Sequence, residues 1–175
     1  MGRHSAEGAL PPGLLGRASL VGNEYAWRVD DIPNVIEAAR AANLVSIGGQ
    51  LQFRLPDGGT CECYWVQVDT YQSVDRALPW KVRVERTAEM AVRDFELLRS
   101  RFDFIWEGRK AFARYLDDLV AQGRDPAGSM CFVWYVLSEE EAMARACKLR
   151  QLKGLPRCTN TDSPVPKICP GWSAS

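Results

Sequence analysis

Residues 50–68 carry a β-hairpin signal that limits the possible folds more than any other part of the sequence. Apolar and polar residues alternate on both sides of a turn at 56–59, which reads Pro-Asp-Gly-Gly. Such alternation is typical of strands with one buried face, and the turn residues suit a tight reversal. Gly48 and Gly49 interrupt the outgoing strand and predict a bulge or a close backbone contact there. The chain must therefore build a sheet around this antiparallel pair. The alternating apolar positions are Leu51, Phe53 and Leu55 on the outgoing strand and Tyr64, Val66 and Val68 on the return.

Further elements follow from the spacing of apolar residues. Alternation over 24–29 and 82–85 predicts two more strands, and the nearly continuous apolar run 130–137 predicts a strand buried on both faces near the centre of the sheet. Helical spacing predicts four helices. Ser138 and Glu141 form a capping box at the start of the last one. The predicted helices cover residues 32–43, 87–102, 112–123 and 138–154.

This order of elements indicates an α+β fold. We expect one domain, with a mixed, mostly antiparallel sheet covered by helices, in the order β-α-β-β-β-α-α-β-α. The domain should span residues 23–154. Residues 1–22 are rich in glycine and proline and predict a flexible N-terminal arm, and residues 155–175 predict a disordered tail rich in Pro, Ser and Thr.

Charge and hydropathy exclude several classes of protein. The 175-residue chain has 22 basic and 22 acidic residues and thus no net charge, which is unlike a typical nucleic-acid or membrane-surface binder. No stretch has the length of apolar residues that a membrane span requires, and the N-terminus has no signal-peptide core. We therefore expect a cytoplasmic protein with no membrane partner. Arginine outnumbers lysine 17 to 5, which suggests a bacterial source.

The residues that could carry chemistry do not form a recognised catalytic or metal-binding set. His4, the single histidine, lies in the predicted arm, so a Cys-His or Ser-His-Asp nucleophilic set is not expected. Cys61 and Cys63 form one Cys-x-Cys pair among six cysteines, without the paired motifs of a structural zinc site. We therefore expect neither a metal nor a cofactor, and an enzymatic role is not favoured.

Aromatic residues and a few polar groups supply the candidate binding residues. Strict alternation places Trp65 on one strand face with Cys61, Cys63 and Asp69, either under a second layer of helices or as an exposed recognition surface. Trp27 and Trp134 fit buried strand positions. At the boundaries of predicted elements, Trp80 and Trp106 could close the core or anchor a partner. Arg83, Arg86 and Arg93 would matter if they converge on one patch, and otherwise belong to a solvated helix face.

The sequence is compatible with three functions. The first is a small protein-binding module of the inhibitor, immunity or adaptor type, which docks to another protein. The second is an enzyme or small-ligand binder with a pocket on the face of Cys61, Cys63, Trp65 and Asp69. The third is RNA binding, because residues 32–102 resemble a double-stranded RNA-binding domain in their predicted order of elements. Residues 87–90 lack the lysine cluster that such a domain presents, so nucleic acid is the least favoured partner.

Overall fold

The computed structural model describes residues 6–152 and confirms the predicted α+β class. Its contacts divide the chain at Glu141. The first unit contains the whole sheet and the helices up to α4, and the second begins at Ala142, within helix α5 (Glu139–Leu152). The predicted C-terminal tail, 155–175, lies outside the described residues.

The five strands form one antiparallel sheet in the order β1-β2-β5-β3-β4. The strand predicted to be central is confirmed, since β5 lies in the middle of this order. Three large aromatic side chains, Phe132, Trp134 and Trp27, are buried on the sheet as their positions in the sequence predict. The strands are β1 (Ser19–Val21), β2 (Glu24–Trp27), β3 (Val45–Arg54), β4 (Thr60–Asp69) and β5 (Met130–Leu137).

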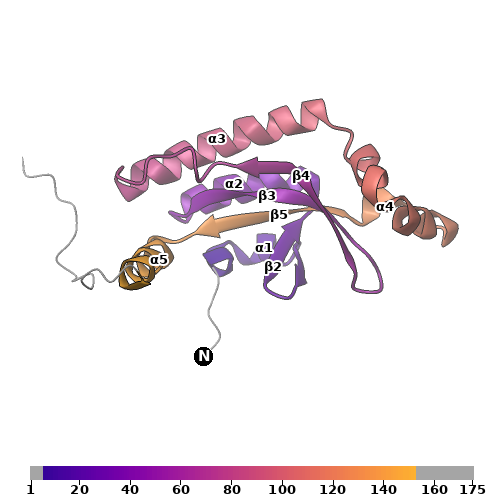
Figure 1. The fold of residues 1–175 in the computed structure, drawn as a ribbon, viewed down its shortest axis with the longest axis horizontal. Helices are drawn as coiled ribbons and strands as arrows, with labels where there is room; N and C mark the ends of the chain where they lie inside the picture. The colour runs from indigo at the N-terminus through magenta and orange to yellow at the C-terminus, as the bar shows by residue number, and fades with distance from the viewer. Residues whose placement is uncertain (1–5, 153–175) are drawn as a thin grey trace, which may run out of the picture. The chain divides into compact units, whose positions relative to one another are not determined.

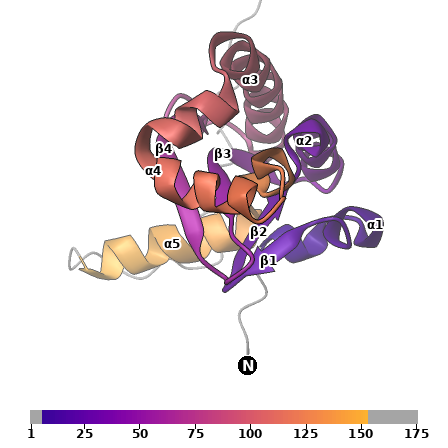
Figure 2. The same ribbon diagram turned by 90° about the vertical axis from the view of Figure 1, so that its right-hand side faces the viewer.

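Two helices cover one face of the sheet, where the main core lies (Figure 1). Helix α2 (Ile32–Ala41) packs against the long helix α3 (Trp80–Arg101), and both contact β3. Phe95 of α3 meets Phe132 and Trp134 of β5 edge to face. Helix α4 (Phe104–Ala121) follows directly after α3 and packs against β4 and β3 (Figure 2). These contacts bury one face of every strand between β2 and β4.

The structure contains the turn, the bulge and the helix cap that the sequence predicts. The turn at 56–59 joins β3 to β4, and the register between β3 and β5 shifts between Ser46 and Gly48, so the predicted bulge is confirmed. Gly48 has a φ of +129°, and a Cβ there would lie 2.0 Å from the carbonyl oxygen of Val68. The capping box is confirmed as well, since the backbone N–H of Glu141 donates to Ser138 Oγ and that of Ser138 to the Glu141 carboxylate.

The predicted strand at 82–85 is wrong, because these residues lie in the first two turns of α3. Val82 and Val84 alternate over too short a span to define a strand. The buried positions from Val84 onward instead follow a helical repeat, which continues through Ala88, Ala91 and Phe95. Packing of this stripe on the sheet therefore overrides the local strand preference. Residues 32–102 thus contain two strands instead of three, and the order that resembled an RNA-binding domain is absent.

The predicted flexible arm over 1–22 is wrong for residues 6–21. This segment forms the short helices η1 (Ala6–Ala9) and α1 (Pro12–Leu15), followed by β1. Leu10 and Leu14 are buried in the main core, and the indole N–H of Trp27 donates to the carbonyl of Leu14 at 3.0 Å. Tertiary contacts thus order a stretch whose glycines and prolines show no apolar periodicity.

The predicted helix at 112–123 begins earlier than expected. Helix α4 starts at Phe104 and has a non-helical conformation at Phe112, with φ −126° and ψ 27°. The apolar stripe that led to the prediction starts at this kink. Two shorter helices complete the described elements, η2 (Val29–Asp31) and η3 (Pro126–Gly128).

Candidate functional site

A bulge in β4 decides which of its residues face the core. Leu51 of β3 pairs with Cys63 and its neighbour Gln50 pairs with Gln67, so residues 64–66 of β4 have no register partner in β3. Cys61 and Cys63 therefore lie in the main core with Val66 and Val68. Strict alternation predicted that both cysteines share a face with Trp65 and Asp69. That prediction is wrong, because the extra residues change the alternation.

Burial makes the two thiols of Cys61 and Cys63 poor nucleophiles. Burial is the main cause that raises the pKa of Cys63 to about 12, with smaller contributions from Cys61 and Glu107. The pKa of Cys61 is also raised, by burial first and then by Asp57. We expect iodoacetamide at pH 8 to label both residues at least ~100-fold more slowly in the folded protein than in urea, because the thiolate is the reactive form. Peptide mapping by mass spectrometry measures this, and equal labelling in both states would contradict the buried placement.

Trp65 lies outside the core and is held in one orientation. Its side chain is 45% exposed, yet its ring stacks on Phe112 of α4 with centroids 6.4 Å apart. Its indole N–H donates to Glu107 Oε2 at 2.9 Å. A large aromatic group is thus presented to solvent with both its ring plane and its polar atom fixed by α4.

Glu107 is the buried carboxylate that orients Trp65. It is 5% exposed and accepts a hydrogen bond from Lys110 Nζ at 2.6 Å on its other oxygen. Lys110, and then the indole of Trp65, hold the pKa of this carboxyl below its usual range, against the effect of burial. Nothing in the sequence alone marks Glu107 or Phe112 as a binding residue. The i,i+3 spacing of Glu107 and Lys110 was the available signal, but it is also common on solvated helices.

Two further exposed aromatic residues accompany Trp65. Tyr64, the preceding residue in the bulge, is 60% exposed, and Trp106, which precedes Glu107 in α4, is 61% exposed. The carboxylate of Asp103 accepts from the backbone N–H of Trp106 at 3.0 Å, which fixes the start of α4. We call Tyr64, Trp65 and Trp106 the aromatic surface. Trp106 is thus one residue from the glutamate that holds Trp65, so two of the three predicted tryptophans belong to the same part of the fold.

Trp80 belongs to a different part of the fold. It is the first residue of α3, whereas α4 follows the other end of this 22-residue helix, about 33 Å away. Its indole N–H donates to the carbonyl of Asn43 at 2.9 Å, and the guanidinium of Arg83 lies 4.8 Å from its ring centre. Trp80 thus links the start of α3 to the segment that follows α2.

The remaining predicted candidates do not form one site. Arg83 and Arg93 lie about 15 Å apart along α3. Arg93 pairs with Asp94 at 2.8 Å, and Arg86 is exposed between them. The Asp69 carboxylate accepts from the backbone N–H of Tyr71, which is a local turn contact. The arginines therefore belong to a solvated face of mixed charge.

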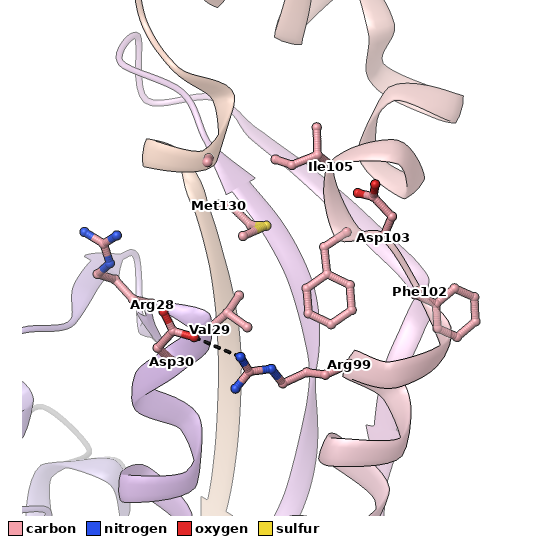
Figure 3. Close-up of a pocket in the computed structure, with 10 residues that line it drawn as sticks. Arg28, Val29, Asp30, Arg99, Phe102, Asp103, Ile105 and Met130 are labelled. Carbon is pink, nitrogen blue, oxygen red and sulfur yellow. Dashed lines mark hydrogen bonds and ion pairs between the residues drawn. The ribbon is translucent and has the colours of Figure 1, made fainter.

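A cavity of about 280 Å³ lies where the end of α3 meets the start of α4 (Figure 3). Its lining combines apolar and charged side chains, with an ion pair between Arg99 and Asp30 at 3.0 Å. Its other carboxylate, Asp103, caps α4. Both acids in the lining are thus engaged, so the cavity offers no uncommitted carboxylate for acid–base chemistry. The lining residues are Arg28, Val29, Asp30, Arg99, Phe102, Asp103, Phe104, Ile105, Ala127 and Met130.

The described residues lack the groups that two classes of site require. Between residues 6 and 152, no group of three or more His, Cys, Asp or Glu side chains could hold a metal ion. Within the same range, none of the helices combines the length and hydropathy needed to cross a membrane.

Comparison with known proteins adds no relative from which a function could be transferred. No protein-family model, curated protein or solved structure matches the chain. The function is therefore inferred from the geometry of the chain itself.

Proposed function

We propose that the protein is a protein-binding module that docks to its partner through the aromatic surface. The observation that carries this proposal is the geometry of Trp65, which is half exposed yet fixed by Phe112 and Glu107. Tryptophan and tyrosine are enriched among the residues that dominate binding energy at protein interfaces. An aromatic side chain that is already ordered loses little conformational entropy on binding.

The bulge in β4 also supports docking through the aromatic surface. β4 is an edge strand, and a regular edge of ten residues could pair with a strand of another chain. The unpaired residues 64–66 interrupt that edge and turn two aromatic side chains outward. Bulges commonly re-aim side chains in this way at functional positions. We infer that the partner is bound by side-chain contacts to Tyr64 and Trp65, and not by extension of the sheet.

The two alternative functions have less support. The small-ligand hypothesis depended on a face shared by Cys61, Cys63 and Trp65, and the cysteines lie in the core. The cavity beside α4 has a suitable size for a small molecule, but its acids are engaged with protein groups. The RNA hypothesis depended on a third strand that is instead part of α3. The docking hypothesis depends on Trp65 and Trp106, and both side chains are exposed in the structure.

Photo-crosslinking tests the proposal with a matched control. We would replace Trp106 with p-benzoylphenylalanine, express the protein in its host and identify crosslinked proteins by mass spectrometry. The same substitution at Leu97, which is 52% exposed on α3, is the control. We expect one protein crosslinked from position 106 and absent from position 97. Its affinity for the purified wild-type protein should fall about 30-fold or more in Trp65→Ala, as expected for an interface hot spot.

Two outcomes would contradict docking through this surface. One is a set of crosslinked proteins that is the same at positions 106 and 97. The other is a captured partner that binds Trp65→Ala and Leu97→Ala equally well. Circular dichroism of each variant establishes that lost binding does not reflect unfolding.

A further inference from the structure

The charged side chains that line the cavity where α3 meets α4 are not equally available to a ligand. The lining contains two arginines, Arg28 and Arg99, and two acids, Asp30 and Asp103. Figure 3 shows Arg28 and Asp30 on one side of the cavity and Asp103 on the other. Arg99 extends from α3 toward Asp30. The four charges sum to zero, so what the cavity can bind depends on which of them are already balanced.

Both acids of the lining are balanced by groups of the protein itself. Arg99 Nη2 donates to Asp30 Oδ1 at 3.0 Å and forms an ion pair with it. The Asp103 carboxylate accepts from the backbone N–H of Trp106 at 3.0 Å, at the start of α4. The N-terminus of a helix carries a partial positive charge, which stabilises a carboxylate there. The lining therefore has little negative charge that is not already compensated.

Within residues 6–152, Arg28 is the arginine of the lining that has no ion-pair partner. Its side chain is exposed. Its backbone is fixed, because its carbonyl accepts from the N–H of Asp31 at 2.9 Å at the start of η2. A guanidinium presents its donors in a planar fork that fits the two oxygens of a carboxylate. Arg28 thus gives one wall of the cavity a positive charge that the protein does not compensate.

The other lining residues form an apolar wall that the core holds in place. Val29 and Phe104 are buried members of the main core, and Ile105 and Met130 pack against it. The volume of about 280 Å³ is near the lower limit for pockets that hold small molecules. A ligand that fits is therefore small, with an apolar body and a negatively charged group that reaches Arg28. The apolar lining residues are Val29, Phe102, Phe104, Ile105, Ala127 and Met130.

We propose that this cavity binds a small organic acid, with its carboxylate on Arg28 and its apolar body against Val29 and Phe104. Arg99 is a second donor, because the side chain of its partner Asp30 is 82% exposed. Ion pairs this exposed are weak, so the carboxylate of the ligand can replace Asp30 on Arg99. The site is separate from partner docking, since no residue of the aromatic surface lines the cavity.

Titration of the purified protein with 3-phenylpropionate tests the site. The neutral 3-phenylpropanamide is the matched probe, because it has nearly the same shape without the negative charge. We would follow backbone amide shifts of the ¹⁵N-labelled protein by NMR at pH 7 and low salt. We expect the acid to shift amides at residues 28–30 and 102–105 and to bind about fivefold more tightly than the amide, the upper range for one exposed ion pair. Since no partner is present, this result is separable from that of the crosslinking experiment.

Two single substitutions at exposed positions have opposite expected effects on the affinity for 3-phenylpropionate. Arg28→Gln should weaken binding about fivefold. Asp30→Asn should strengthen it, because Arg99 is released from its ion pair. Arg86→Gln is the control, since it removes an exposed arginine about 20 Å from Arg99 along α3 and should leave the affinity unchanged.

Four outcomes would each overturn the proposal. They are equal binding of the acid and the amide, no shifts at residues 28–30 and 102–105, equal effects of Arg28→Gln and Arg86→Gln, and no gain of affinity in Asp30→Asn. The dispersion of the amide spectrum shows in the same experiment that each variant is folded.

Discussion

Gly49→Ala is expected to unfold the protein or to lower its free energy of unfolding by more than about 4 kcal/mol. A Cβ at this position would lie 1.9 Å from the carbonyl oxygen of Val133 and 3.1 Å from the ring of Phe132. The oxygen belongs to the backbone of β5, which pairs with β3 through Gly49 and Trp134. Neither strand can move away without loss of central ladder hydrogen bonds, so the clash cannot be relieved by a side-chain rotation. The whole stability of a domain is about 5–15 kcal/mol, which makes this loss decisive.

Thermal unfolding followed by circular dichroism measures the effect of Gly49→Ala. Gly128→Ala is the matched control, because a Cβ at Gly128 would meet no heavy atom within 4 Å. The control should stay within about 0.5 kcal/mol of the wild type. If Gly49→Ala melted at the same temperature as this control, the close approach of β3 and β5 would be wrong.

The second large effect is expected for Phe95→Ala, at about 3–5 kcal/mol. Phe95 is fully buried in the second half of α3, with its ring centre 5.2 Å from that of Phe132 and 6.4 Å from that of Trp134. Truncation leaves a cavity between α3 and the sheet and removes both edge-to-face contacts. The helix that connects to α4 would lose its main anchor on β5.

Urea denaturation of Phe95→Ala and of Leu97→Ala separates burial from helix propensity. Leu97 lies two residues further along α3 and is exposed, so its truncation should change stability by less than about 0.5 kcal/mol. An unchanged m-value would indicate that both variants unfold from the same compact state. Equal destabilisation by the two substitutions would contradict the packing of α3 on the sheet.

The sequence by itself determines the local elements of this protein. The alternation on both sides of 56–59 specifies the hairpin of β3 and β4, because hydrophobic period and turn chemistry agree there. The same holds for α2, where Ile32, Val35, Ile36 and Ala39 are all buried at their predicted positions. The α+β class follows from the order of such segments. These features depend on residues that are near in sequence, so their pattern can be read directly.

Tertiary contacts determine the structure of segments whose local sequence pattern is ambiguous. The stretch 82–85 has a weak strand pattern, but it is helical because the stripe of α3 buries more surface against the sheet. Residues 6–21 have no periodicity, yet Leu10 and Leu14 fill a space beside Trp27 that exists only in the folded sheet. Long-range burial offsets the entropy of ordering these segments.

The candidate site depends most strongly on tertiary structure. The sequence identified Trp65 and Trp106, but strict alternation placed Cys61 and Cys63 beside Trp65. The unpaired residues 64–66 reverse that alternation, and the glutamate that orients Trp65 comes from α4, 42 residues further along the chain. A bulge arises where the twist of a sheet and the packing of its neighbours favour it, and local composition does not report either. The sequence thus determined which aromatic residues are available, whereas the packing of α4 on the edge strand decided how Trp65 is held and exposed.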